Sequence, residues 1–109
     1  MPPTHPARGY YYHYKHDPEG PINNYAYEVM GVGHHTEDDA RELDKYVVVY
    51  RPLYEAFVYT NGKMFDIRPL TMFMETVEKD GVTKNRFTKI TDEAVLSELA
   101  TIATKMYGV

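Results

Sequence analysis

Along residues 10–90, short apolar stretches alternate with clusters of turn-forming residues, which is typical of β-strands. The clearest strand is Tyr46–Tyr50, which is β-branched or aromatic at every position. Strands are also predicted over Tyr10–Tyr14 and Tyr25–His35. The glycines at positions 31 and 33 indicate a bend or bulge within the latter strand.

A hairpin is predicted around the Asn61–Gly62 dipeptide, because asparagine and glycine both tolerate the positive φ angles of a tight turn. Its arms are Ala56–Thr60 and Met64–Arg68. In the second arm, apolar side chains at positions 65 and 67 share one face and charged side chains at 66 and 68 share the other. Pro69–Phe73 is predicted as a tight or 3₁₀-like turn whose leucine and phenylalanine enter the core.

The last third of the chain predicts a second hairpin and then a helix. The hairpin runs from Glu75–Glu78 to Arg86–Ile90. Thr91 is expected to cap a helix over Asp92–Tyr107, with Gly108 as its C-terminal stop. The apolar residues of this helix recur at helical spacing and form one stripe, made of Val95, Leu96, Leu99, Ile102, Ala103 and Met106.

Five to six short strands with short turns, followed by one amphipathic helix, predict a mainly β fold, namely a small antiparallel β-barrel. We expect an irregular tail over residues 1–9, the barrel over residues 10–90 and the helix over residues 91–109. The helix must bury its apolar stripe, and we expect it to pack on the barrel. The alternative is a homodimer that forms through this stripe.

Composition narrows the class of protein. With 109 residues, the chain has the length of one domain, and no apolar stretch approaches the roughly 18 residues of a membrane span. The first eight residues contain no apolar run typical of a secretory signal, so we expect a cytoplasmic protein with no membrane contact. The absence of cysteine excludes disulfides, thiol nucleophiles and cysteine-based zinc sites.

Tyrosine is the unusual feature of the composition, because the chain has eleven tyrosines, four phenylalanines and no tryptophan. A phenol combines an apolar ring with a hydrogen-bonding hydroxyl, which suits the half-buried positions of a twisted sheet. The same combination suits the lining of a binding groove. Composition alone leaves both interpretations open.

Several short motifs occur in an order that points to a known family. They are His13-Tyr14-Lys15, Tyr27–Val32, His35–Glu37, Val48–Arg51, Leu53-Tyr54, Ile67–Leu70, Met72-Phe73, Arg86-Phe87 and Ile90. This set, which spans residues 12–90, resembles the bacterial domain of unknown function 1653 family. The resemblance implies an SH3-like β-barrel, and it implies no particular activity because the family has none established.

The chain departs from the family's pattern at two positions. His16 stands where a glycine usually follows the His-Tyr-Lys motif, and Asp66 stands where an aromatic usually precedes the Val-Arg-Pro-Leu segment. If that aromatic lines a site in the family, the specificity of this chain differs. The C-terminal helix lies beyond the matched part, so the resemblance implies nothing about it.

Two arginines are candidates for binding an anion. Arg51 and Arg68 each end a predicted strand immediately before a proline, which stiffens the backbone next to the guanidinium. A guanidinium binds a carboxylate or phosphate through two parallel hydrogen bonds. The alternative is that both arginines form internal salt bridges, Arg68 with Asp66 or Glu75 and Arg51 with Glu55.

Histidines raise the alternative of a small metal-assisted hydrolase. His34 and His35 are followed by three carboxylates at positions 37–39, and imidazole with carboxylate suits zinc, iron or manganese. No HExxH spacing is present, and the only serine, Ser97, has no base near it in the sequence. In this alternative, His13 or His35 would be the general base.

Nucleic-acid binding is a further alternative. The segment 61–91 carries six basic residues, and bases stack on aromatic rings such as those of the tyrosines. Against it stand the net charge of −4 and the loss of an aromatic at Asp66.

The hypothesis that best combines these features is a non-catalytic binding module for an anionic small molecule or a partner peptide. The rings would supply stacking area, and the arginines would hold the anionic group. We expect its groove to be lined by polar and aromatic side chains at strand ends, namely His13, Tyr14, His35, Tyr50, Arg51 and Arg68. We expect no cofactor and no metal ion.

Overall fold

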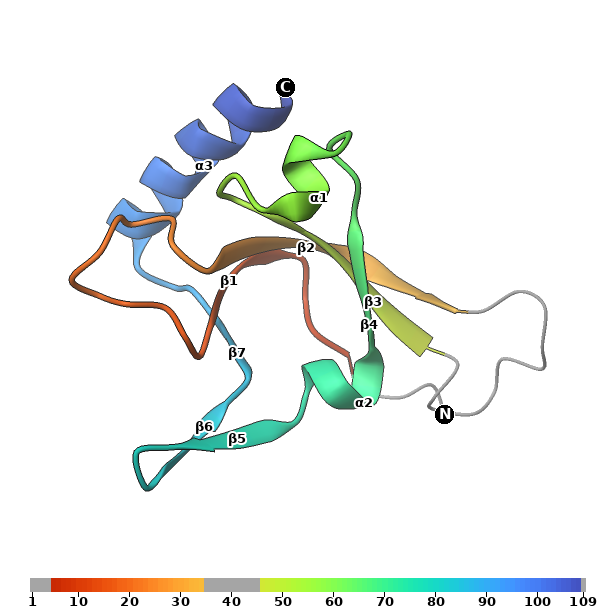
Figure 1. The fold of residues 1–109 in the computed structure, drawn as a ribbon, viewed down its shortest axis with the longest axis vertical. Coiled ribbons are helices and arrows are strands. Elements are labelled where there is room, and N and C mark those ends of the chain that lie inside the picture. The colour runs from red at the N-terminus through yellow and green to blue at the C-terminus, as the bar shows by residue number, and fades with distance from the viewer. Residues whose placement is uncertain (1–4, 35–45, 109) are drawn as a thin grey trace.

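The computed structural model of the chain describes residues 5–34 and 46–108. Its main element is a five-stranded antiparallel sheet with the strand order β4-β3-β2-β1-β7 (Figure 1). The strands are β1 (Gly9–His13), β2 (Ala26–His34), β3 (Tyr46–Pro52), β4 (Asp66–Pro69) and β7 (Phe87–Lys89). The expected bulge is confirmed in β2, where the register with β3 shifts between Val29 and Gly31.

A second, two-stranded sheet consists of β5 (Thr76–Lys79) and β6 (Val82–Asn85). The second predicted hairpin is therefore wrong in its pairing, because β5 pairs with β6 while β7 pairs with β1. The mainly β class is confirmed, but the described strands do not close into a barrel. The hairpin pairs only with itself, so β4 and β7 remain the two edges of an open sheet.

The hairpin predicted around Asn61 is also wrong. Residues Phe57–Thr60 form a single helical turn, α1, and the carbonyl of Phe57 accepts hydrogen bonds from both the backbone and the side-chain nitrogen of Asn61. Asn61 has a negative φ, and the positive φ angles fall on Gly62 and Lys63 instead. The turn chemistry of this dipeptide thus ends a helical turn and does not join two paired strands.

Two further helices follow the prediction more closely. The predicted turn is α2 (Leu70–Phe73), and Leu70 and Phe73 are both buried as expected. The C-terminal helix is α3 (Glu93–Tyr107). Its N-cap is Asp92 rather than the expected Thr91, because an Asp92 carboxylate oxygen accepts the backbone N–H groups of Ala94 and Val95 at 2.9 and 3.2 Å.

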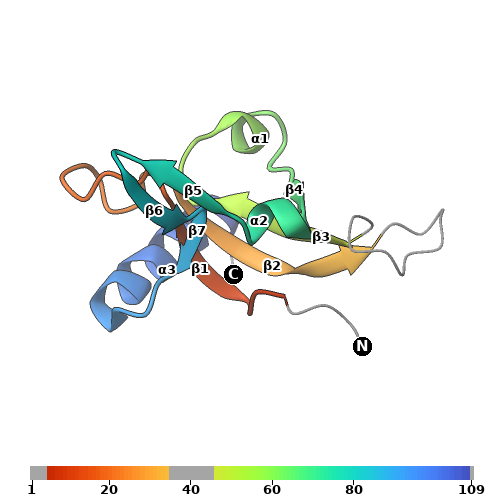
Figure 2. The same cartoon turned by 90° about the horizontal axis from the view of Figure 1, so that it is seen from below.

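The main sheet buries a separate apolar core on each face. One face, here called the α3 face, packs Ala26 and Leu53 against Leu99 and Ala103 of the helix. The opposite face, called the α2 face, packs a second core that consists of Tyr11, Val29, Val48, Tyr50, Leu70, Phe73 and Phe87. Figure 2 shows α3 on one side of the sheet and α2 with the β5–β6 hairpin on the other.

Side chains alternate between these two faces along each strand. In β1, Tyr10 and Tyr12 pack with the α3 core, whereas Tyr11 packs with the α2 core. No helix in the described parts of the chain is long and apolar enough to cross a bilayer.

Candidate functional site

The last residue of β1, His13, is half-buried on the α2 face and lies among aromatic rings. The centre of its imidazole is 4.5 Å from the ring centre of Tyr14, 5.1 Å from that of Phe87 and 5.7 Å from that of Tyr25. Its Nδ1 accepts the backbone N–H of Lys15 at 3.2 Å. The neutral ring therefore carries its proton on Nε2, which is left as a hydrogen-bond donor.

His13 is uncharged at neutral pH. Burial, followed by the positive charges of Arg68, Arg86, Lys15 and Lys79, lowers the pKa of His13 to about 4. All of these charges are positive, so the space around the imidazole has a positive potential. The charge of Asp66 is negative, and it acts on the neighbouring phenols of Tyr27 and Tyr54.

The ring of Tyr27 also contacts this imidazole, with ring centres 6.5 Å apart. The hydroxyl of Tyr27, in β2, is hydrogen-bonded to the hydroxyl of Tyr54, just after β3. Burial raises the pKa of both Tyr27 and Tyr54, so both phenols stay protonated at neutral pH. The buried ring of Tyr50 packs edge-on against Tyr27, with ring centres 5.4 Å apart.

The guanidinium of Arg68 lies on the same face. Its Nε donates a hydrogen bond of 3.2 Å to the hydroxyl of Tyr50, and its central carbon is 5.6 Å from the ring centre of Phe87. The ion pairs in the described ranges are Arg51 with Glu28 and Arg86 with Glu75, and Arg68 has none there. We call His13, Tyr25, Tyr27, Tyr50, Tyr54 and Arg68 the His13–Arg68 cluster.

Strand β4 has an inverted polarity. Asp66 and Arg68 are half-buried and face inward, whereas Ile67 is 67% exposed and the preceding Phe65 is 52% exposed. Burial raises the pKa of Asp66, and the charge of Arg68 opposes that rise. Turning charged groups inward costs stability unless they are paired, so this strand has the pattern of a functional surface rather than of a core strand.

Of the residues predicted from sequence, the structure brings His13, Tyr50 and Arg68 to the α2 face. Tyr14 contacts His13 at the margin of the cluster. His35 lies outside the described residues, and so do the three carboxylates that follow it.

Arg51 is on the α3 face and does not converge with Arg68. Its Nε and a terminal nitrogen bind one carboxylate oxygen of Glu28 at 2.9 and 2.8 Å. The guanidinium carbon lies 3.9 Å from the ring centre of Tyr107 in α3. The predicted partner, Glu55, is not the one used. Arg51 thus joins β3 to β2 and to the helix, which is a structural role.

Sequence reasoning missed Tyr25, Tyr27 and Tyr54 as members of the cluster. Tyr27 and Tyr54 belong to the motifs quoted above, and the excess of tyrosine was the compositional signal for them. Tyr25 has a backbone signal that appears only in the structure. Its φ is +51°, a left-handed conformation that is unfavourable for a bulky side chain.

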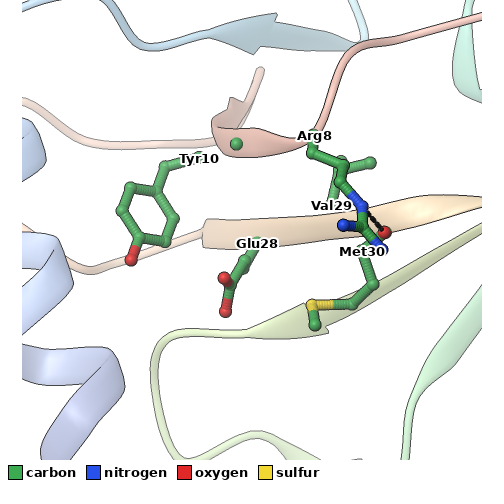
Figure 3. A pocket seen from close by; sticks show the side chains of 6 residues that line it. Arg8, Tyr10, Glu28, Val29 and Met30 are labelled. Carbon is green, nitrogen blue, oxygen red and sulfur yellow. Dashed lines mark hydrogen bonds between the residues drawn. The ribbon is translucent and has the colours of Figure 1, made fainter. Parts of the chain in front are cut away.

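A cavity of about 370 Å³ lies where β1 meets β2, lined by Arg8, Tyr10, Glu28 and Met30 among others (Figure 3). Its charged groups already have internal partners. Arg8 Nε donates to the carbonyl of Met30 at 2.6 Å, and Glu28 is paired with Arg51. We therefore place the candidate site at the His13–Arg68 cluster and not at this cavity.

A metal centre has no support in the described ranges, where no three histidine, cysteine, aspartate or glutamate side chains come together in a way that could hold an ion. The metal-assisted hydrolase also needs His35, which lies outside those ranges. The structure therefore adds no observation in favour of that alternative.

Comparison with known proteins places most of the chain in a family. The model of a family described as a protein of unknown function (DUF1653) matches residues 9–89, which is most of the chain. Searches of the curated proteins and of the solved structures found no match. The matched range contains every residue of the His13–Arg68 cluster and ends before α3.

Proposed function

The chain belongs to the DUF1653 family, and we propose that it binds a small anionic ligand, a carboxylate or a phosphate, at the His13–Arg68 cluster. The observation that carries the proposal is Arg68, a half-buried guanidinium that forms no ion pair in the described part of the chain, although its charge acts on the nearby Asp66. A buried charge is costly unless it is paired, and a ligand anion would supply the missing partner.

The hydrogen-bond donors and cations near Arg68 support an anion rather than a cation, and Asp66 is a carboxylate that opposes it. Besides Arg68, the imidazole of His13 offers its Nε2–H, and the hydroxyls of Tyr27 and Tyr54 stay protonated. Lys15, Lys79 and Arg86 add positive potential at the imidazole. Hydrogen bonds from charged donors to an anion are about twice as strong as neutral ones.

The same chemistry favours binding over acid–base catalysis. A general base must be able to take up a proton near the working pH. His13 has a pKa of about 4, lowered by burial and neighbouring cations, and its Nδ1 is already occupied by the Lys15 N–H. The phenols have pKa values raised by burial, so none of these groups is a base at neutral pH.

The test is a titration of the full chain with phosphate and, separately, with acetate, in which binding is detected from the amide chemical shifts. We expect saturable shifts around residues 13, 50 and 68, and their loss in Arg68→Gln. The matched control is Arg51→Gln, which removes the same charge from the other face of the sheet and should leave binding intact. Equal binding by Arg68→Gln and the unmodified chain would refute the proposal.

A further inference from the structure

Tyr25 combines a strained backbone with an exposed aromatic ring. Its φ of +51° falls in the left-handed region, in a turn where Ala26 N–H bonds to the carbonyl of Asn23 at 3.1 Å. Glycine or asparagine is the favoured residue for such a position. A tyrosine there costs stability, and strain of this kind tends to persist where the side chain has a function.

The positive φ angles of the other two non-glycine residues in the described ranges have a simpler explanation. Lys63 and Asp80 each lie next to a glycine, at 62 and 81, in exposed tight turns, and their side chains are flexible or short. Tyr25 has no adjacent glycine and carries a large rigid ring.

The strained turn holds the Tyr25 ring beside the cluster. The residue is 39% exposed. Its ring lies nearly parallel to the imidazole of His13, with an interplanar angle of 28°, and has its centre 5.9 Å from that of Tyr54. The backbone carbonyl of Tyr25 accepts the N–H of His13 at 2.9 Å, so the two residues are fixed relative to each other. The exposed part of the ring is a preformed stacking surface.

The stacking surface and the guanidinium are linked through one imidazole. His13 contacts the ring of Tyr25 and also the ring of Phe87, and Arg68 lies 5.6 Å from that Phe87 ring. We propose that the ligand is a flat ring that carries an anionic group, with the ring stacked on Tyr25 and the anion held by Arg68 and His13 Nε2–H. This inference rests on the proposed function and names its ligand class.

Two kinds of molecule share this chemistry, aromatic carboxylates and nucleoside phosphates. Base–aromatic stacking is strong enough to change affinity by about tenfold or more. Matched probes separate the contribution of the ring from that of the anion. Benzoate is compared with cyclohexanecarboxylate, and adenosine 5′-monophosphate with ribose 5-phosphate.

The experiment measures dissociation constants for these four probes by chemical-shift titration of the full chain. We expect the flat-ring member of each pair to bind about tenfold or more tightly than its partner. In Tyr25→Gly this preference should disappear, while the thermal midpoint should rise or stay the same because glycine relieves the strained φ. Tyr25→Phe should keep the preference, since the ring remains.

Lys63→Gly is the matched control, because it relieves a positive φ far from the cluster and should leave the preference unchanged. Equal affinity within both pairs, with Arg68→Gln still abolishing binding, would overturn the inference and leave the proposed anion site standing. Absence of binding by all four probes to the unmodified chain would overturn both. Which pair shows the larger preference distinguishes a nucleoside phosphate from an aromatic carboxylate.

Discussion

The two faces of the main sheet differ in how their arginines are paired. On the α3 face, Arg51 is paired with Glu28, the hydroxyl of Tyr107 donates to the carbonyl of Pro52, and that of Tyr12 donates to the carbonyl of Ile22. On the α2 face, Arg68 has no carboxylate partner in the described residues. Polar groups with internal partners hold the fold together, whereas those without them are available to a ligand.

The largest effect is expected in the core of the α3 face. Leu99 is fully buried between α3 and the sheet, so Leu99→Ala should lower the free energy of unfolding by about 2–5 kcal/mol. Urea denaturation followed by circular dichroism measures this change. Anion binding by the folded fraction should be unchanged, and a weakened affinity would show that the two faces are not independent.

The two arginines give the most direct contrast. Arg51→Gln leaves Glu28 without its partner and should lower the free energy of unfolding by about 1–2 kcal/mol. Arg68→Gln removes a half-buried charge that forms no ion pair in the described residues, so it should lower stability by less than Arg51→Gln.

Thermal denaturation of both variants without ligand measures this difference. A loss of stability in Arg68→Gln as large as that in Arg51→Gln would show that Arg68 is structural. Glu28→Gln in the background of Arg51→Gln is the control, because its additional effect should be small once the partner is gone.

A smaller effect on stability, which depends on pH, is expected from His13. Burial, followed by the nearby positive charges, lowers the pKa of His13 in the folded protein to about 4, compared with 6.5 for an ordinary histidine. Between these values the unfolded chain binds the proton and the folded chain does not. The contribution of His13 to stability is therefore complete above about pH 6.5 and declines as the pH falls to about 4.

This dependence is measured as the free energy of unfolding from pH 7 to pH 4 in the unmodified chain and in His13→Gln. The free energy of unfolding of the unmodified chain, minus that of His13→Gln, should decrease as the pH falls from about 6.5 to about 4. His5→Gln, at an exposed position, is the matched control and should keep the profile of the unmodified chain. An imidazole titration of His13 with a midpoint near 6.5 would contradict the prediction.

The smallest effect is expected on the outer side of β4. Ile67 is mostly exposed, so Ile67→Thr should change the free energy of unfolding by less than about 0.5 kcal/mol. The change is measured by urea denaturation. A large loss would show that the apolar side of β4 is covered in solution, which would reverse the assignment of its two sides.

Local sequence patterns predicted the elements that depend on neighbouring residues or that have a regular spacing of apolar residues. The stripe of α3, the β-branched run of β3 and the glycine bulge of β2 each have a sequence signal that the tertiary structure keeps. The hairpin around Asn61 was wrong because a helical turn satisfies the same asparagine and glycine. Sheet closure was not predictable either, because it depends on which distant strand pairs with β7.

The candidate site was predictable only in part. Alternation along a strand places Tyr50 and Arg51 on opposite faces, so the two could not both line one groove on the same face. Tyr27 and Tyr54 meet because Tyr27 pairs with Pro52 across β2 and β3, a register that no local pattern specifies. The left-handed backbone of Tyr25 is likewise a property of the folded turn.

Phe87 belongs to the hydrophobic core and to the candidate site at once. Its ring lies parallel to that of Phe73 in α2, with centres 4.1 Å apart, while its other contacts reach His13 and Arg68. Any change of this side chain alters core packing and ligand contacts together, so it offers little freedom for tuning specificity. New ligand preferences in relatives or in engineered variants should therefore arise at the exposed side chain of Tyr25, whose replacement leaves the aromatic stack with α2 intact.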